Sequence, residues 1–234
     1  EKVEADSLQY ARSSGLAGIF MLNAMECDGL ISLLKSIEIP VILVNRYLRS
    51  MDTDVVTVDN YRCGYLATEY LIQHGHRNIA HLAGPASSIT CSNRALGYRD
   101  AMKSAGLPVP DDGIYFADRT YDDGYTFGMK ICETPPEQRF TAVYCTAGLM
   151  ADGMADALWS KGIRIPEDIS VICNDDSQRS HKQKIKLTCV EQDPHTMGVA
   201  AAMLYLERLK APKHPIKRIV YPPVLIEHES VRSV

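Results

Sequence analysis

Short apolar segments alternate along the chain with longer segments of helical period. Runs rich in Val, Ile, Leu and Ala predict strands buried on both faces at 16–22, 41–44, 55–58, 79–83, 142–145 and 169–173. The segments between them predict helices at 61–74, 93–105, 124–133 and 150–161, which end near Gly or Pro. Asp193 followed by Pro194 predicts the start of a further helix. A strand followed by a helix, repeated in this way, predicts an α/β fold with doubly wound parallel sheets.

The composition narrows the class of protein. The 234 residues are 46% hydrophobic, which is enough to bury one large core or two smaller ones. Lys and Arg number 25 against 29 Asp and Glu, so the chain lacks the basic surface that grips phosphates, and any nucleic-acid contact must come from elsewhere. No apolar run approaches the ~20 residues that span a bilayer, so we expect no membrane partner.

The reactive side chains form no pattern typical of catalysis or metal binding. Seven Cys are scattered without a Cys-x-x-Cys pair, which argues against a disulfide framework and a zinc site and indicates a reducing, cytoplasmic location. The chain has no Gly-x-Ser-x-Gly motif, no phosphate-binding loop and no His pair at metal spacing. We therefore predict no catalytic residue, no metal, no cofactor and no enzyme activity, although a Cys–His pair stays open without a preferred candidate.

Several segments together resemble the signatures of one family. They read GHRNIA (75–80), LAGP (82–85), RALGY (94–98), IPEDISV (165–171) and LIEHES (225–230). In this order they resemble the LacI/GalR family of bacterial transcription regulators, in the part that binds the effector. Each segment is weak alone, and their order carries the resemblance.

The resemblance implies a fold like that of periplasmic sugar-binding proteins, with two lobes, three crossovers and an effector held between the lobes. The first lobe would comprise 1–58 and 192–214, and the second 60–189 and 217–230, with crossovers near Asp59, Glu191 and Lys217. The first lobe would be incomplete, because the family's first βαβ unit is absent from this chain. The family's DNA-binding helix-turn-helix would be absent as well.

The family also implies function and partners. A regulator of this kind binds a small-molecule effector, here a sugar or sugar derivative, and binds operator DNA through an N-terminal helix-turn-helix. It acts as a homodimer, for which apolar residues of 150–159 are candidates. The alternative is an extracytoplasmic sugar-binding protein of a transporter, which has the same fold. The unpaired Cys and the segment 165–171 favour the regulator.

Arg94 and Asp175 match the positions at which the family contacts ligand hydroxyl groups. The guanidinium of Arg94 donates in a fixed fork, and the carboxylate of Asp175 accepts hydroxyl hydrogens. A surface ion pair is the alternative for Arg94. Both residues, with Arg119, lie in loops after predicted strands or at a following helix start, so we expect them to converge at the carboxyl edge of a sheet.

Two departures from the family bear on the ligand. Arg119 stands where many relatives carry an aromatic residue, with Tyr121 close by, and Ala147-Gly148 replaces a polar Asn-Asp pair. These changes favour an acidic or phosphorylated ligand over a neutral sugar. A surface ion pair of Arg119 with Asp118 or Asp122 is the equal alternative.

Three further residues are ligand-binding candidates at the predicted hinge and lip. Asn45 and Arg46 follow the strand 41–44, and Gln192 lies near the second crossover. For each of them a hydrogen bond between lobes or at a crossover is as consistent with the sequence as a ligand contact.

Overall fold

The computed structural model describes residues 10, 14–22, 27–175 and 185–234, and the chain divides into two compact units. The first unit comprises Glu1–Asp59, Ser87–Ile89 and Asp193–Pro222, and the second comprises Asn60–Ala86, Thr90–Gln192 and Pro223–Val234. Each unit has a sheet and a core of its own, so each is described separately.

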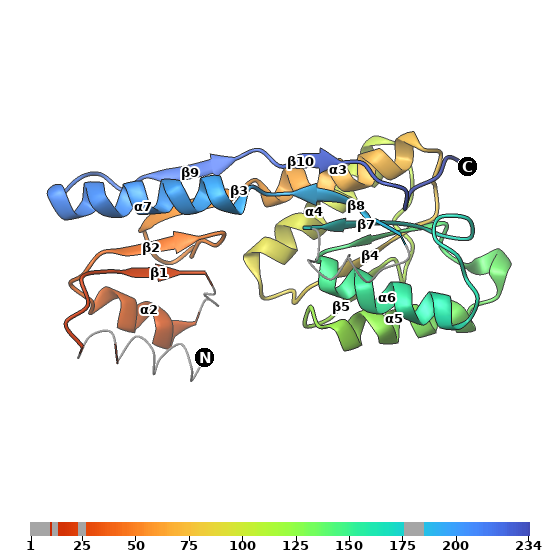
Figure 1. The fold of residues 1–234 in the computed structure, drawn as a ribbon, viewed down its shortest axis with the longest axis horizontal. Helices are drawn as coiled ribbons and strands as arrows, with labels where there is room; N and C mark the ends of the chain where they lie inside the picture. Colours follow the sequence, from red (N-terminus) through yellow and green to blue (C-terminus); the bar gives the residue numbers. More distant parts are fainter. Residues whose placement is uncertain (1–9, 11–13, 23–26, 176–184) are drawn as a thin grey trace. The chain divides into compact units, whose positions relative to one another are not determined.

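The first unit is a four-stranded parallel sheet in the order β1-β2-β3-β9, with described helices on both faces (Figure 1). Its elements are β1 (Ile19–Met21), α2 (Asp28–Lys35), β2 (Val41–Val44), β3 (Asp54–Val58), α7 (Pro194–Lys210) and β9 (Arg218–Tyr221). On one face α7 packs Met197, Ala201 and Leu204 against β2 and β3. On the other face α2 packs against the apolar residues that the same strands turn that way.

The second unit is a six-stranded sheet in the order β10-β8-β7-β6-β4-β5. Its elements are α3 (Asn60–Gln73), β4 (Ile79–Ala83), α4 (Ile89–Ser104), β5 (Ile114–Phe116), α5 (Tyr121–Glu133), the short 3-10 helix η1 (Pro136–Gln138), β6 (Ala142–Cys145), α6 (Gly148–Ser160), β7 (Ser170–Asn174), β8 (Thr188–Glu191) and β10 (Val224–Ile226). Helices α3 and α4 cover one face, and α5 and α6 cover the other (Figure 1). The predicted doubly wound α/β class is confirmed, with the single difference that β10 runs antiparallel to β8.

Local hydrogen bonds decide where the helices begin. Thr120 accepts from the backbone N–H of Asp123, and the Asp123 carboxylate accepts from the N–H of Thr120, which is a capping box. It starts α5 three residues before the predicted 124–133. The predicted start of α7 is confirmed, because Asp193 accepts from the N–H of Thr196 and Pro194 occupies the first turn.

The last boundary between the units lies later than the sequence predicted. We expected the chain to cross near Lys217, with 217–230 in the second lobe, but β9 pairs with β3 and the chain stays in the first unit to Pro222. The backbone N–H of Lys217 donates to Asp54 at 2.9 Å, which aligns β9 with the start of β3. Ile219 and Tyr221 then pack with α7, so β9 is needed to complete the core of the first unit.

The apolar residues of 150–159 are not a free surface for a partner, which corrects the predicted dimer patch. Met150, Met154 and Leu158 are fully buried within the second unit, where they join the core between α6, α5 and the sheet. A helix that is apolar on nearly all sides packs into the interior of its own domain. Trp159 alone among the large apolar residues of this stretch is part-exposed.

Helices α5 and α6 are interlocked through glycine. A Cβ atom on Gly153 would lie 2.0 Å from the carbonyl oxygen of Tyr121, and one on Gly124 would lie 2.0 Å from that of Met150. We expect Gly153→Ala to reduce the free energy of unfolding by about 1–3 kcal/mol, because backbone atoms must move apart. Gly198→Ala in α7 is the control, since nothing lies within 4 Å of its Cβ position. It should stabilise by about 0.5 kcal/mol in urea unfolding, and equal effects of the two substitutions would contradict the packing argument.

His76 joins three segments at the amino edge of the second sheet. Its Nδ1 lies 3.0 Å from Thr141 Oγ1, and its Nε2 lies 2.9 Å from Ser170 Oγ and 3.1 Å from the carbonyl oxygen of Arg232. Burial of the ring lowers the pKa of His76 from 6.5 to about 4, although the Arg232 carbonyl opposes this shift. The neutral imidazole therefore fastens the end of the chain to β6 and β7.

This arrangement predicts a loss of stability in mild acid. Because the pKa of His76 is lower in the folded than in the unfolded chain, the unfolded chain binds the proton first, and stability falls as the pH drops below about 6.5 towards about 4. Between pH 7.5 and 5.0 the loss from this residue should be about 2 kcal/mol. Urea unfolding of wild type and His76→Gln at both pH values checks it. An equal pH effect in the two proteins would show that His76 is not responsible.

Candidate functional site

Polar side chains gather at the carboxyl edge of the sheet in the second unit. Arg119 lies in the loop after β5, Thr146 directly after β6, Asp175 directly after β7 and Gln192 directly after β8. The carboxyl ends of parallel strands meet at one edge of a sheet, where α/β proteins hold their ligands. Helix α4, which follows β4, brings Arg94 to the same edge, as its contacts show.

Arg94 is a buried cation, with 4% of its surface exposed. Its Nε donates to Asn60 Oδ1 at 2.9 Å, and its Nη1 donates to the carbonyl oxygen of Thr146 at 2.7 Å. Burial opposes its charge, but interactions with Tyr144 and Asp175 outweigh it, and the pKa of Arg94 is raised. The guanidinium is thereby fixed between the start of α3 and the end of β6.

Asp175 supplies the opposite charge. Gln192 Nε2 donates to its Oδ2 at 2.9 Å, and its backbone N–H donates to the carbonyl oxygen of Val190. Burial raises the pKa of Asp175, and Arg94 and Gln192 partly offset that rise. The carboxylate is therefore poorly solvated, so a hydroxyl or amine of a ligand would bind to it more strongly than in open water.

A second layer of polar groups supports this edge. The Tyr144 hydroxyl donates to Asn174 Oδ1, and Asn174 Nδ2 donates to the carbonyl oxygen of Val190 at 3.2 Å. The ring of His81 stacks on that of Tyr144 with centroids 4.3 Å apart. These side chains are fully buried, and they hold the ends of β6, β7 and β8 in a fixed relation.

Three atoms at this edge are buried and have no hydrogen-bond partner: Arg119 Nε, Thr146 Oγ1 and Gln192 Oε1. Most buried polar atoms in native proteins are paired, so a cluster of unpaired ones marks a place where something else binds. The three atoms offer a donor, a hydroxyl that can donate or accept, and an acceptor. Compounds with several hydroxyl groups fit such a mixed set.

Backbone conformation singles out the same positions. Among the described residues other than glycine, positive φ occurs at Asn45 (59°), Arg119 (67°) and Asp175 (58°). Each follows a strand by one to three residues. Side chains with a Cβ rarely adopt this region, and such strain gathers at functional sites.

The chain matches one family over nearly its whole length. A family model described as periplasmic binding proteins and sugar binding domain of LacI family covers residues 1–224. The chain belongs to this family. The resemblance predicted from the sequence segments is confirmed.

Individual relatives in the LacI family are named as regulators of transcription. The HTH-type transcriptional repressor PurR of Pasteurella multocida is 33% identical over 236 residues, covering 100% of this chain and 69% of the relative. PurR of Vibrio atlanticus is 33% identical, and the matched region spans 84% of this chain and 58% of that protein's length. A solved structure, the transcriptional regulator CelR–cellobiose complex, has a TM-score of 0.88 at 28% identity and covers 97% of this chain and 69% of that one. All three relatives are transcriptional regulators by name.

Tyr121 is held differently from the other residues that the LacI-family resemblance suggested. Its hydroxyl donates to Asp156 of α6 at 2.6 Å, and this bond together with partial burial raises the pKa of Tyr121 to about 12. Asp156 lies about 12 Å along α6 from its first residue, at a rise of 1.5 Å per residue. The hydroxyl of Tyr121 therefore joins two helices and is not among the groups gathered around Arg94.

Asn45 and Arg46 belong to the first unit. Arg46 Nε donates to the carbonyl oxygen of Leu22, and its Nη1 donates to Ser88 Oγ, both at 3.3 Å. Asn45 Oδ1 is buried without a partner, while its backbone N–H donates to the carbonyl oxygen of Val56 at 2.7 Å. Asn45 thus repeats in the first unit the combination of positive φ and an unpaired polar atom seen for Arg119.

Two of the cysteines at the ends of the central strands are poor nucleophiles. None of the seven cysteines is in a disulfide bond, and Cys145, Cys173 and Cys189 lie side by side on β6, β7 and β8. Burial raises the pKa of Cys145 and of Cys173, which keeps both as thiols of low reactivity. Within the described part of the chain, no group of three or more His, Cys, Asp or Glu is placed to hold a metal ion.

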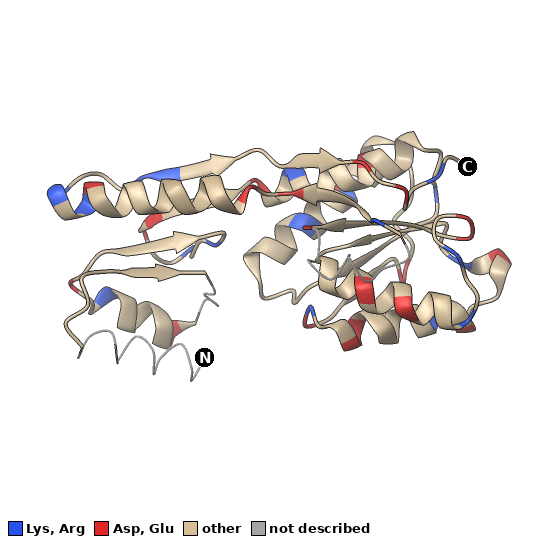
Figure 2. Cartoon of the chain, viewed as in Figure 1, with Lys and Arg blue, Asp and Glu red and all other residues tan. Residues whose placement is uncertain are grey.

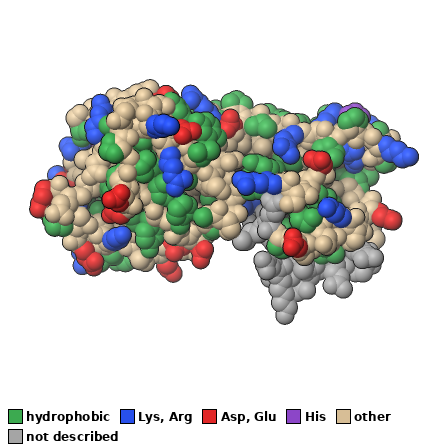
Figure 3. Space-filling view, turned by 180° about the vertical axis from the view of Figure 1, so that it is seen from behind, with side chains coloured by type: hydrophobic (Ala, Val, Ile, Leu, Met, Phe, Trp, Pro, Cys, Tyr) green, Lys and Arg blue, Asp and Glu red, His purple; other side chains and the backbone are tan. Residues whose placement is uncertain are grey.

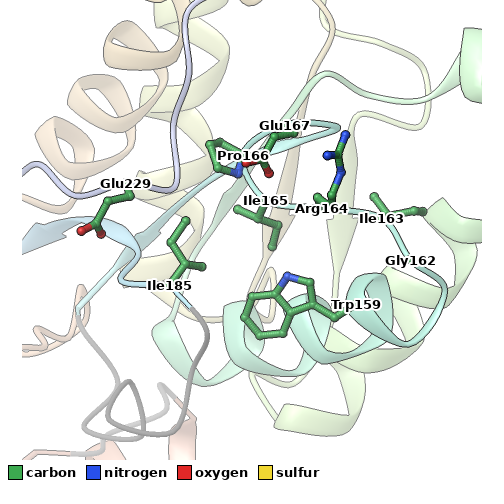
Figure 4. A pocket seen from close by; sticks show the side chains of 9 residues that line it. All are labelled: Trp159, Gly162, Ile163, Arg164, Ile165, Pro166, Glu167, Ile185 and Glu229. Carbon is green, nitrogen blue, oxygen red and sulfur yellow. The ribbon is translucent and has the colours of Figure 1, made fainter.

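A separate pocket of about 640 Å³ lies near the amino end of β7 (Figure 4). Trp159, Ile163, Ile165 and Ile185 give it apolar walls, with Arg164 and Glu167 at its edge. None of the ligand-binding residues predicted from the sequence lines it. The unpaired polar atoms belong to the opposite ends of the strands, so we assign function to that edge.

Proposed function

We propose that the whole protein is a ligand-responsive transcriptional regulator of the LacI type, and that this chain is its effector-binding and dimerisation domain. The effector is a small molecule of the sugar or sugar-derivative class, and it binds at the carboxyl edge of the second sheet. Operator DNA is bound by a helix-turn-helix outside this chain, and the protein acts in the cytoplasm as a homodimer.

The unpaired buried atoms carry the proposal. Thr146 Oγ1, Gln192 Oε1 and Arg119 Nε lack hydrogen-bond partners. The buried Arg94 donates to the carbonyl oxygen of Thr146, and Asp175 accepts from Gln192, so these two charged groups lie next to two of the unpaired atoms. A sugar hydroxyl donates and accepts at once, so neighbouring hydroxyl groups can pair with all of these groups. The relative CelR was solved with cellobiose, and a LacI-family regulator of Enterococcus faecium was solved with ribose.

The charge of this domain argues against nucleic acid as its direct partner. Its formal charge is -4, and acidic side chains line α5 and α6 (Figure 2). On the face seen in Figure 3, Lys and Arg are interspersed with acidic and apolar side chains. No helix among the described residues has the length and apolar character needed to cross a membrane.

The alternative is an extracytoplasmic sugar-binding protein that serves a transporter. The family model includes periplasmic binding proteins, which favours keeping this candidate. The seven free cysteines favour the reducing cytoplasm, and the relatives named above are regulators.

DNA binding by the whole protein separates the two functions. Genomic DNA fragments are first selected on the immobilised protein. Their affinity for the protein is then measured by fluorescence anisotropy, with and without each member of a panel of sugars, sugar acids, sugar phosphates and nucleosides. A regulator binds selected fragments tightly, and an effector changes that affinity by about 5-fold to 150-fold. Failure to select any fragment, together with sugar binding, would favour the transporter protein.

Asp175→Asn tests the edge directly, because it keeps the shape of the side chain and removes its charge. We expect it to weaken binding of an active panel member by about tenfold, through loss of a charged hydrogen bond. The control is Asp112→Asn, in the exposed turn before β5. Calorimetry on both variants decides the point, and equal affinities would remove Asp175 from the site.

A further inference from the structure

Arg119 carries a charge that the described part of the chain does not neutralise. It makes no ion pair or hydrogen bond with the described residues, and its Nε is buried without a partner. An arginine on an open surface would gain hydrogen bonds from water, but this Nε is shielded from solvent. The missing hydrogen bond of this one nitrogen is therefore a cost that a bound group can offset, while the residue as a whole is part-exposed.

The neighbouring backbone keeps Arg119 in this place. A Cβ atom on Gly84 would lie 2.7 Å from Arg119 Cγ and 2.5 Å from Cys91 Sγ, so the stem of Arg119 lies directly against the loop after β4. Its own φ of 67° turns the residue out of the ordinary strand or helix conformation. Both features restrict where the guanidinium can point.

The nearby carboxylates do not serve as its counter-charge. The Asp123 carboxylate accepts from the N–H groups of Asp118 and Thr120 and from the Thr120 hydroxyl, which lowers the pKa of Asp123 and occupies it at the start of α5. Asp118 and Asp122 are exposed, and neither forms an ion pair with Arg119. The surface ion pair that the sequence left open is not formed.

Of Arg94, Asp175 and Arg119, the described charged side chains named above at this edge, Arg119 alone has no counter-charge among the described residues. Arg94 and Asp175 interact with each other, since Arg94 lowers the pKa of Asp175 and Asp175 raises that of Arg94. Arg119 remains unmatched. A neutral ligand could fill the hydrogen bonds of Thr146 and Gln192, but it would leave this cation without a counter-charge.

We propose that the effector carries an anionic oxygen group, a phosphate or a carboxylate, which Arg119 binds. This rests on the proposed function, because it names the chemical class of ligand for the same edge. The planar guanidinium forms paired hydrogen bonds with either group. The acidic ligand should therefore bind about tenfold to a hundredfold more tightly than its neutral counterpart.

The test compares matched probes on the whole protein by calorimetry. The pairs are glucose with glucose 6-phosphate, ribose with ribose 5-phosphate, and glucose with glucuronate, and inorganic phosphate is titrated alone. We expect at least one acidic member to bind tenfold or more tightly than its neutral partner. The phosphate and glucuronate arms distinguish the two sources of the anionic group.

Three substitutions connect the preference to Arg119. Arg119→Gln should bring the ratio of acidic to neutral affinity from tenfold or more down to about one, because it removes the charge, and Arg119→Lys should restore only part of that ratio, because a point charge lacks the fork. Gly84→Ala keeps the charge but displaces the stem, so it should also reduce the preference. Arg164→Gln is the control, since it removes the same charge from an exposed residue at the amino end of β7.

Each outcome has a distinct meaning. A preference for the acidic member that survives Arg119→Gln, or that is lost equally in Arg164→Gln, overturns the assignment to Arg119. Neutral probes that bind as tightly as acidic ones overturn the inference and leave the proposed function standing. Absence of binding by every probe, charged or neutral, counts against the sugar-binding function and the inference together.

Discussion

Arg208→Ala is expected to lower the free energy of unfolding of the first unit by about 3–5 kcal/mol, because it leaves a buried carboxylate without its partner. Asp54 is 4% exposed, and Arg208 meets it with two parallel bonds, Nε to Oδ2 and Nη2 to Oδ1, both at 2.9 Å. Arg208 also donates to the carbonyl oxygens of Pro212 and Pro215, so it closes the loop between α7 and β9. One side chain of α7 thus joins this helix to β3 and to the loop before β9.

Urea unfolding and hydrogen exchange of α7 and β3 measure this loss. Arg208→Lys should recover less than half of it, because an ammonium cannot make the paired bonds. The control is Lys217→Met, which breaks the exposed ion pair with Glu207 and should change stability by less than about 1 kcal/mol. If Arg208→Ala and Lys217→Met lower the free energy of unfolding by similar amounts, burial does not make the Arg208–Asp54 pair more stabilising than an exposed pair.

The sequence predicted most strands that are buried on both faces, with β8 as the exception, and missed three of the four strands at sheet edges. The predicted runs 41–44, 79–83 and 142–145 coincide with β2, β4 and β6, because an uninterrupted apolar stretch is typical of a central parallel strand. Strands β5, β9 and β10 are three or four residues long, partly exposed and at sheet edges. Such strands are held by pairing with a distant neighbour, which a local pattern does not show.

The order of strands and helices predicted which edge of the sheet holds the candidate site, but it did not predict the hydrogen bonds formed there. Arg94, Arg119 and Asp175 were expected near the carboxyl ends of strands, and their role in binding stays a prediction. Arg94 bonds to Asn60 and Thr146, which are 34 and 52 residues away in sequence. Neither Asn60 nor Thr146 is a site residue in the predictions from the sequence. The signal that could have found Thr146 is its place directly after the apolar strand 142–145.

Tyr144 shows a similar limit of sequence reasoning. Within the run 142–145 it is indistinguishable from a core aromatic residue, yet its hydroxyl donates to Asn174 at the end of the adjacent strand. The ring of Tyr144 packs in the core, and its hydroxyl supports the polar edge of the sheet. Only the register of β6 with β7, which depends on the whole sheet, brings the two side chains together.

Arg94→Ala should lower the free energy of unfolding by about 3 kcal/mol and weaken binding of an active probe by about tenfold to a hundredfold. The substitution removes two charged hydrogen bonds at once, one to Asn60 Oδ1 and one to the carbonyl oxygen of Thr146. The surface ion pair that the sequence left open for Arg94 is not what the structure shows, because a side chain with 4% exposure belongs to the core as well. Arg94→Lys should rescue little of either loss, since one ammonium cannot replace the fork.

A double-mutant cycle with Asp175→Asn separates the two roles of Arg94. If the charges of Arg94 and Asp175 stabilise each other, the double variant should be less destabilised than the sum of the single variants, by about 0.5–3 kcal/mol. Arg99→Ala, an exposed substitution on the same helix, should stay within about 0.5 kcal/mol of wild type. Additive effects in the cycle would mean that Arg94 acts only through Asn60 and Thr146. Unchanged probe affinity in Arg94→Ala, measured on protein shown to be folded by circular dichroism, would exclude Arg94 from the binding site.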